Sequence, residues 1–207
     1  MPYAQEATMS VHLPPLPPTP GDEYQPAGRS IADLVAEEHR QLLELARRLT
    51  EPGPDPRYGR DVLVAALSRH LSGEEQYLLP AVRHAVEGAK PLVDEVVAGD
   101  VELLRALRGL TDDGLPDVAA RIEAHARAVD PLVQRLCASA TEEELVRLGN
   151  RLEIAEEAAP TRPHPAIPHH APWNRIVEPA VGLIDKVRDV LSGRHTRLDE
   201  LTEPPPR

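Results

Sequence analysis

The sequence of 207 residues contains no Phe, one Trp and four Tyr, whereas Leu, Val and Ala are abundant. Because strands are enriched in aromatic and β-branched residues, this composition leaves little material for a β-sandwich and favours packed helices. The chain also lacks an apolar run of about 18 residues, which is what a membrane-spanning helix requires. Its length suits one good core with appended segments rather than two large domains.

Cysteine is nearly absent, and positive charges are fewer than negative ones. The single cysteine, Cys137, cannot form an intrachain disulfide, so we expect a reducing compartment and a cytoplasmic protein. The N-terminus has neither a basic start nor an apolar stretch of the kind found in signal peptides. A net charge of −11 argues against nucleic acid or an anionic membrane as the main partner.

Proline is plentiful but unevenly spread, with seven of the 23 in residues 1–26 and six in residues 160–179. This distribution predicts a disordered Pro-rich arm over residues 1–28 and a helical bundle over 29–140. Residues 141–194 should form a C-terminal helix, an extended Pro- and His-rich segment, and a final amphipathic helix over about 174–191. Residues 195–207 are expected to be a disordered tail.

Apolar periodicity and capping residues predict the helices themselves. Ser30 is a candidate N-cap, and Thr141 with Glu144 forms a candidate capping box. Bends are expected at Pro80 and Pro131. The expected helices cover about 30–49, 61–88, 91–109, 116–138 and 141–159. The fold class is therefore all-α: an antiparallel up-down-up-down four-helix bundle with additional C-terminal helices.

Each apolar stripe of the four bundle helices is interrupted by an ionisable residue. His39 interrupts the first stripe and His125 the fourth, while Asp100 interrupts the third. The second stripe carries His70 and Glu74, which are four residues apart and so lie one above the other. Buried charge is costly unless it is paired or metal-bound, and bundle cores hold metals with such residues on facing helices. The mixture of nitrogen and oxygen donors suits iron, manganese or zinc.

Four sequence motifs carry a resemblance to a known family. They are "EEH" at 37–39, "HLSGEEQYLLP" at 70–80, "EAH" at 123–125, and "APTRPHP" at 159–165 followed by "GLIDKVRDVLSGR". The second is similar to an H-x-x-x-E-E-x-x-L-[YF]-P run and is the most specific. Over roughly residues 31–194 the chain thus resembles the hemerythrin-like (HHE cation-binding) family, of the actinobacterial type with a C-terminal extension.

The resemblance implies a four-helix bundle that holds a non-haem, usually di-iron, centre. Carried over by position, His39, His70, Glu74 and His125 are metal ligands, with Glu74 as the bridging carboxylate. The activities of the family include binding of O₂ or nitric oxide, sensing, and handling of peroxide.

The sequence departs from the family pattern on the third and fourth helices. The third helix normally supplies a histidine, for which Asp100 is the best substitute. The acid expected four residues after His125 is Val129, and Asp130 follows one residue later. Five residues correspond to about 140° around a helix, so Asp130 reaches the site only if Pro131 distorts that turn. The centre could therefore be di-iron, a single-metal site or a vestige.

Three more histidines, His164, His169 and His170, stand in the Pro-rich segment. They could complete an under-ligated site by folding over the end of the bundle, or they could be turn residues that face solvent. The sequence leaves their role open.

Three functions remain open at this point. The first is a hemerythrin-like iron protein that binds or reacts with O₂, nitric oxide or peroxide. The second is an O₂-activating di-iron oxidase or oxygenase with a small organic substrate; an apolar pocket beside the metal would favour it. The third is a metal-free helical interaction module, which a sealed interior with paired histidine–carboxylate contacts would favour. No catalytic residue is assigned; an enzyme of this kind would be a non-haem di-iron oxidoreductase.

Overall fold

The computed structural model describes residues 26–51, 56–159, 161 and 163, and these residues contain helices and no strand. The all-α class expected from the composition is confirmed. The elements are α1 (Ile31–Leu49), α2 (Pro56–Gly73), the π-helical turn η1 (Glu74–Leu78), α3 (Leu79–Ala85), α4 (Lys90–Leu107), the 3-10 turn η2 (Asp112–Gly114), α5 (Leu115–Cys137) and α6 (Glu142–Ala158).

Two helices begin at the capping residues that the sequence predicts. The hydroxyl of Ser30 accepts a hydrogen bond from the Asp33 N–H at 3.2 Å, at the start of α1. At the start of α6, the Glu144 N–H donates to the Thr141 hydroxyl at 3.3 Å, and the Thr141 N–H donates to the Glu144 carboxylate at 2.8 Å. Both predicted starts are confirmed. Each cap satisfies N–H groups in the first turn that have no partner within the helix.

The second predicted helix is longer and less regular than expected. It begins at Pro56 rather than near Asp61, because proline fits the first helical position, where no N–H is required. The irregularity expected at Pro80 takes the form of η1, in which the Leu79 N–H bonds to the carbonyl of Glu74, five residues back. Proline donates no N–H and crowds the preceding turn, so a wide turn directly before it relieves both problems.

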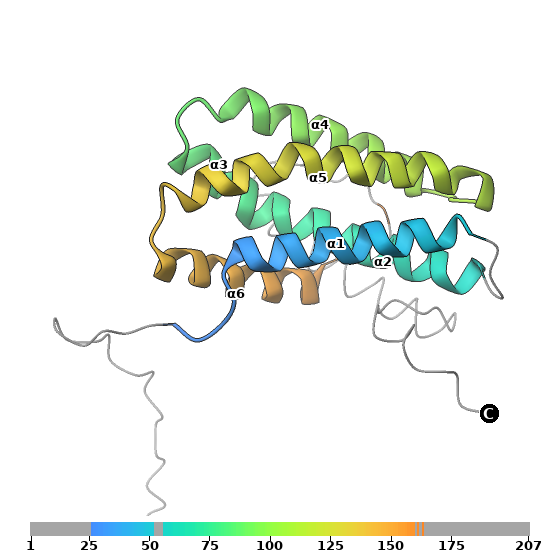
Figure 1. The fold of residues 1–207 in the computed structure, drawn as a ribbon, viewed down its shortest axis with the longest axis horizontal. Coiled ribbons are helices and arrows are strands. Elements are labelled where there is room, and N and C mark those ends of the chain that lie inside the picture. The colour runs from blue at the N-terminus through green and yellow to red at the C-terminus, as the bar shows by residue number, and fades with distance from the viewer. Residues whose placement is uncertain (1–25, 52–55, 160, 162, 164–207) are drawn as a thin grey trace, which may run out of the picture.

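The helices pack side by side along the long dimension of the protein (Figure 1). α1 packs against α2 and α5, and α4 packs against α5 and α3. α6 lies along α1, α2 and η1, on the side away from α4 (Figure 1). α6 therefore covers the segment that contains Glu74 from one side. No helix in the described part of the chain is long and apolar enough to cross a membrane.

The last residues of the predicted N-terminal arm contact α6. The Asn150 side chain donates a hydrogen bond to the Ala27 carbonyl at 3.0 Å. A Cβ at Gly149 would lie 2.2 Å from the Arg29 carbonyl oxygen, so only glycine permits this close approach. The rest of the arm, His164, His169, His170, the final helix expected over 174–191 and the tail from 195 lie outside the described residues.

Candidate metal centre

Four buried side chains from α1, α2, η1 and α5 meet in the interior: His39, His70, Glu74 and His125. Glu74 lies at their centre, with its Oε1 3.5 Å from Nε2 of both His39 and His70. Its Oε2 is 3.1 Å from Nε2 of His125. The three rings stand edge to face, with centroids 4.9, 5.2 and 5.6 Å apart. Their Nε2 atoms therefore point at one shared position beside the carboxylate.

The atoms that face this position are buried and make no hydrogen bonds. Among the described residues, Nε2 of the three histidines and both oxygens of Glu74 have ion-pair contacts with one another but no hydrogen-bond partner, and the Glu74 side chain is 0% exposed. A buried polar atom without a partner costs about 1–3 kcal/mol. Neighbouring donors around an ion with bonds of about 2.1 Å lie roughly 3.0–3.4 Å apart, close to the nitrogen–oxygen distances observed. The group could hold a metal ion.

The opposite nitrogen of each ring, Nδ1, contacts a carboxylate instead. A carboxylate only accepts hydrogen bonds, so Nδ1 is the protonated nitrogen and Nε2 of a neutral ring turns its lone pair inward. Metal-binding histidines in proteins are commonly oriented in this way. The pairs are His39 with Asp130 at 2.9 Å, His70 with Glu38 at 2.8 Å, and His125 with Asp100 at 2.7 Å.

Asp100 and Asp130 lie behind the rings and not among the converging atoms, in contrast to the ligand role expected from the sequence. Asp100 is buried on α4 and reaches only the outer edge of the His125 ring. Asp130 is on α5 with a side chain 53% exposed, and it crosses to His39 on α1. Five residues of helix turn Asp130 away from His125 and toward the neighbouring helix. The structure thus brings together His39, His70, Glu74 and His125. The two aspartates contact the outer nitrogens of His39 and His125, on the far side of each ring from Glu74.

The electrostatic environment favours protonation of the His39 and His125 rings around Glu74. Burial alone would raise the pKa of Glu74, but His70 and His125 outweigh it and hold that pKa well below its usual range. Burial likewise opposes charge on His125, but Asp100 and Glu74 raise its pKa well above the usual value. The centre therefore holds either protons or a metal ion between its lone pairs, and a metal would displace the protons.

The site occupies a polar layer between two apolar clusters. The layer consists of His39, His70, Glu74, Asp100 and His125. The first cluster includes Val35, Leu78, Val96 and Val129, and the second includes Leu42, Leu67, Leu103 and Ile122. Each helix thus enters the layer from one cluster and leaves into the other. The turn η1 begins at Glu74, so the π-helical geometry occurs where the carboxylate enters the centre.

Two carboxylates that the sequence motifs do not single out as ligands lie beside His70. Glu38 on α1 bonds to His70 and contacts Glu156 from α6. Burial and the adjacent carboxylates of Glu38 and Glu74 raise the pKa of Glu156 to about 10, against the opposing charge of Arg69. A signal was present: Glu156 continues the buried stripe of the α6 helix. That stripe comprises Leu145, Gly149 and Leu152 at helical spacing.

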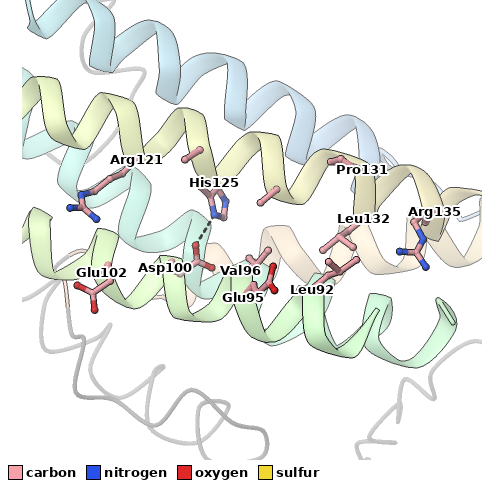
Figure 2. Close-up of a pocket in the computed structure, with 13 residues that line it drawn as sticks. Leu92, Glu95, Val96, Asp100, Glu102, Arg121, His125, Pro131, Leu132 and Arg135 are labelled. Carbon is pink, nitrogen blue, oxygen red and sulfur yellow. Dashed lines mark hydrogen bonds and ion pairs between the residues drawn. The ribbon is translucent and has the colours of Figure 1, made fainter. Parts of the chain in front are cut away.

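A groove of about 570 Å³ runs between α4 and α5 and touches the outer side of His125 (Figure 2). Asp100 and His125 face each other at its edge, and apolar side chains such as Leu92 and Leu132 line it. The groove is open above Gly99, since a Cβ built there would meet nothing within 4 Å. The groove could admit a small organic molecule, separated from Glu74 by the His125 ring.

Comparison with known proteins adds no assignment. The sequence matches no family model, no curated protein and no solved structure. The assignment of the centre therefore depends on its geometry: a helical protein with a buried histidine–glutamate group that could hold a metal ion.

Proposed function

We propose that this protein is a hemerythrin-like non-haem iron protein. Its ferrous ion is held by His39, His70, His125 and Glu74, and it binds O₂, nitric oxide or peroxide at a remaining coordination position. In this proposal α1, the α2–η1–α3 segment, α4 and α5 form the up-down-up-down bundle, with α6 added to it. A cytoplasmic location stays a prediction.

One observation carries the proposal: five buried nitrogen and oxygen atoms face one position, and each ring nitrogen on the outer side has a carboxylate partner. The lone pairs of such atoms repel one another unless protons or a metal ion lie between them. Three carboxylates hold the imidazoles in the tautomer that a metal requires, so the histidines are oriented for an ion before one arrives.

The donor set supports iron. Three imidazole nitrogens and one carboxylate oxygen suit a borderline divalent ion, and no sulfur belongs to the group. Cys137 lies more than three helical turns beyond His125 on α5. Bound iron would supply redox chemistry and affinity for diatomic ligands, while the surrounding residues orient the rings and exclude bulk water. Four ligands suffice for one ion, so the geometry favours a mononuclear centre over the di-iron centre that the resemblance implies.

The groove between α4 and α5 favours a second function, an O₂-activating oxidase that acts on a small organic molecule. Its apolar lining beside Asp100 and His125 is the kind of site that such a substrate requires. Catalysis there would need the substrate to approach the metal past the His125 ring, which makes this the weaker candidate.

A metal-free interaction module is the third reading, and the paired histidine–carboxylate contacts are the feature that it predicts. Nε2 of each histidine also faces Glu74, at 3.1–3.5 Å, but these inner contacts lack the geometry of a hydrogen bond. The module would have to hold protonated histidines around Glu74 in place of a metal. Buried ionic groups of this kind add little stability relative to apolar residues, so an interaction role does not account for them.

Metal analysis with anaerobic Fe(II) titration tests the proposal. We expect iron to occupy the centre and, after exposure to nitric oxide, to give the electron paramagnetic resonance signal of a ferrous–nitrosyl species. His70→Ala should remove both, whereas His84→Ala, which changes an exposed histidine on α3, should keep both. A wild-type protein that folds but takes up no iron would refute the proposal.

A further inference from the structure

A second group of potential ligands lies on the other side of His70 from the buried centre. It comprises Glu38 on α1, His70 on α2 and Glu156 on α6, with one donor atom of each within 4.8 Å of the others. His70 belongs to both groups: its Nε2 faces Glu74, and its Nδ1 bonds to Glu38 at 2.8 Å. The two groups are therefore neighbours that share one imidazole ring.

Glu156 is built into this position by the packing of α6. A Cβ at Gly73 would lie 2.7 Å from Cγ of Glu156, so the Glu156 side chain passes close over α2 at a glycine, where a larger residue would crowd it. Its Oε1 is inaccessible to solvent and has no hydrogen-bond partner among the described residues. A carboxyl group confined in this way can carry its negative charge only if a cation lies beside it.

Glu38 supplies the second carboxylate and an approach from solvent. Its side chain is 21% exposed, and it contacts the carboxyl group of Glu156. Two carboxylates in contact cannot both ionise unless a cation lies between them; otherwise they share a proton.

We propose that a second divalent cation binds between Glu38 and Glu156, on the outer side of His70. Carboxylate oxygens select a hard ion such as Mn²⁺, Fe²⁺ or Mg²⁺, and water completes its coordination shell. One oxygen of Glu38 continues to accept the His70 Nδ1–H, so the second ion and the buried ion are linked through one carboxylate and one ring. The protein then holds two metals, with α6 supplying a ligand that the other helices lack.

This inference rests on the proposed function only in sharing His70, and the two can be tested separately. Mn²⁺ serves as the probe, because the free ion is counted by electron paramagnetic resonance. We expect about two Mn²⁺ per wild-type chain and about one for Glu156→Gln, which keeps the shape of the side chain and removes its charge. Glu153→Gln, on the same helix with an exposed side chain, is the matched control and should bind two.

His39→Ala distinguishes the two sites, since His39 belongs only to the buried centre. It should lose one ion and keep the one that Glu156→Gln removes. If the proposed function alone fails, His39→Ala will bind as much Mn²⁺ as wild type, while Glu156→Gln still binds less. An unchanged stoichiometry in Glu156→Gln would overturn the second site.

A crystal of the wild-type protein soaked in Mn²⁺ gives a test that does not depend on any variant folding. An anomalous-scattering peak between the carboxylates of Glu38 and Glu156 is expected. The absence of a peak there, with the two carboxyl groups in direct contact, would mean that they share a proton instead and would overturn the inference.

Discussion

The polar layer and the apolar clusters on either side of it show two ways of filling a helical interior. The clusters bury leucine, valine and alanine, which contribute to stability wherever they are enclosed. The layer encloses three histidines and two acids, which cost free energy unless a cation compensates them. The clusters are therefore sufficient to explain the fold, and the layer requires a functional explanation. Substitutions in each region should separate metal binding from folding.

Glu74→Gln should have the largest effect on metal binding. The Glu74 side chain is 0% exposed, and the change keeps its size but removes the only carboxylate among the described residues that faces the buried position. We expect iron in the buried centre to be lost, with affinity reduced about 100-fold or more, because an outer hydrogen-bond partner alone is worth about 10–100-fold.

Glu87→Gln is the control for Glu74→Gln, because it makes the same change at an exposed position between α3 and α4. It should bind iron as wild type does, as measured by anaerobic titration and metal analysis. Full iron occupancy in Glu74→Gln would mean that the buried group is not the metal site.

Leu63→Ala tests the apolar side of the comparison. Leu63 is fully buried in the second cluster, about two helical turns before His70. The truncation should lower the free energy of unfolding by about 2–5 kcal/mol through lost burial and the cavity left behind. Iron stoichiometry should stay at the wild-type value below the unfolding transition. Loss of iron from a folded Leu63→Ala protein would show that the layer is not independent of the clusters.

The sequence predicted the all-α class and the buried group of three histidines and Glu74 from the same feature. Apolar stripes located the helices, and His39, His70, Glu74 and His125 could be recognised because each replaces an apolar residue on a stripe. Such positions point inward whatever the details of packing. Helix starts at Ser30 and Thr141 were predictable because capping is local.

The carboxylates that contact the outer ring nitrogens depend on how the helices pack against one another, and the apolar stripe of a single helix does not specify that packing. Asp100 is on its stripe, yet its side chain stops at the ring of His125. The angle of Asp130 from His125 along the helix gave no hint of its partner, which is His39 on another helix. The position of Glu156 beside His70 depends on how α6 packs over Gly73, which the sequence of α6 does not specify.

Asp100→Asn should weaken iron binding by about 10-fold, the lower end of the range for losing such a partner. Asparagine keeps the shape, but it is neutral, and its amide can turn either an N–H₂ or an oxygen toward His125 Nδ1. The ring then loses the charge that fixes its tautomer. Anaerobic titration measures the change. A complete loss of iron, equal to that in Glu74→Gln, would instead indicate that Asp100 binds the metal directly.

Asp130→Asn should have the smallest effect on iron, well below 10-fold. Its contact with His39 Nδ1 is 2.9 Å long, similar to that of Asp100, but the Asp130 side chain is 53% exposed where that of Asp100 is 12% exposed. Water can replace a carboxylate at an exposed position and still accept the Nδ1–H, and solvent screens the lost charge. Comparing the two variants by titration thus measures how much burial strengthens the same contact. The double variant should equal the sum of the single effects if each aspartate acts only on its own ring. A larger effect for Asp130→Asn than for Asp100→Asn would contradict this ranking and assign Asp130 to the metal.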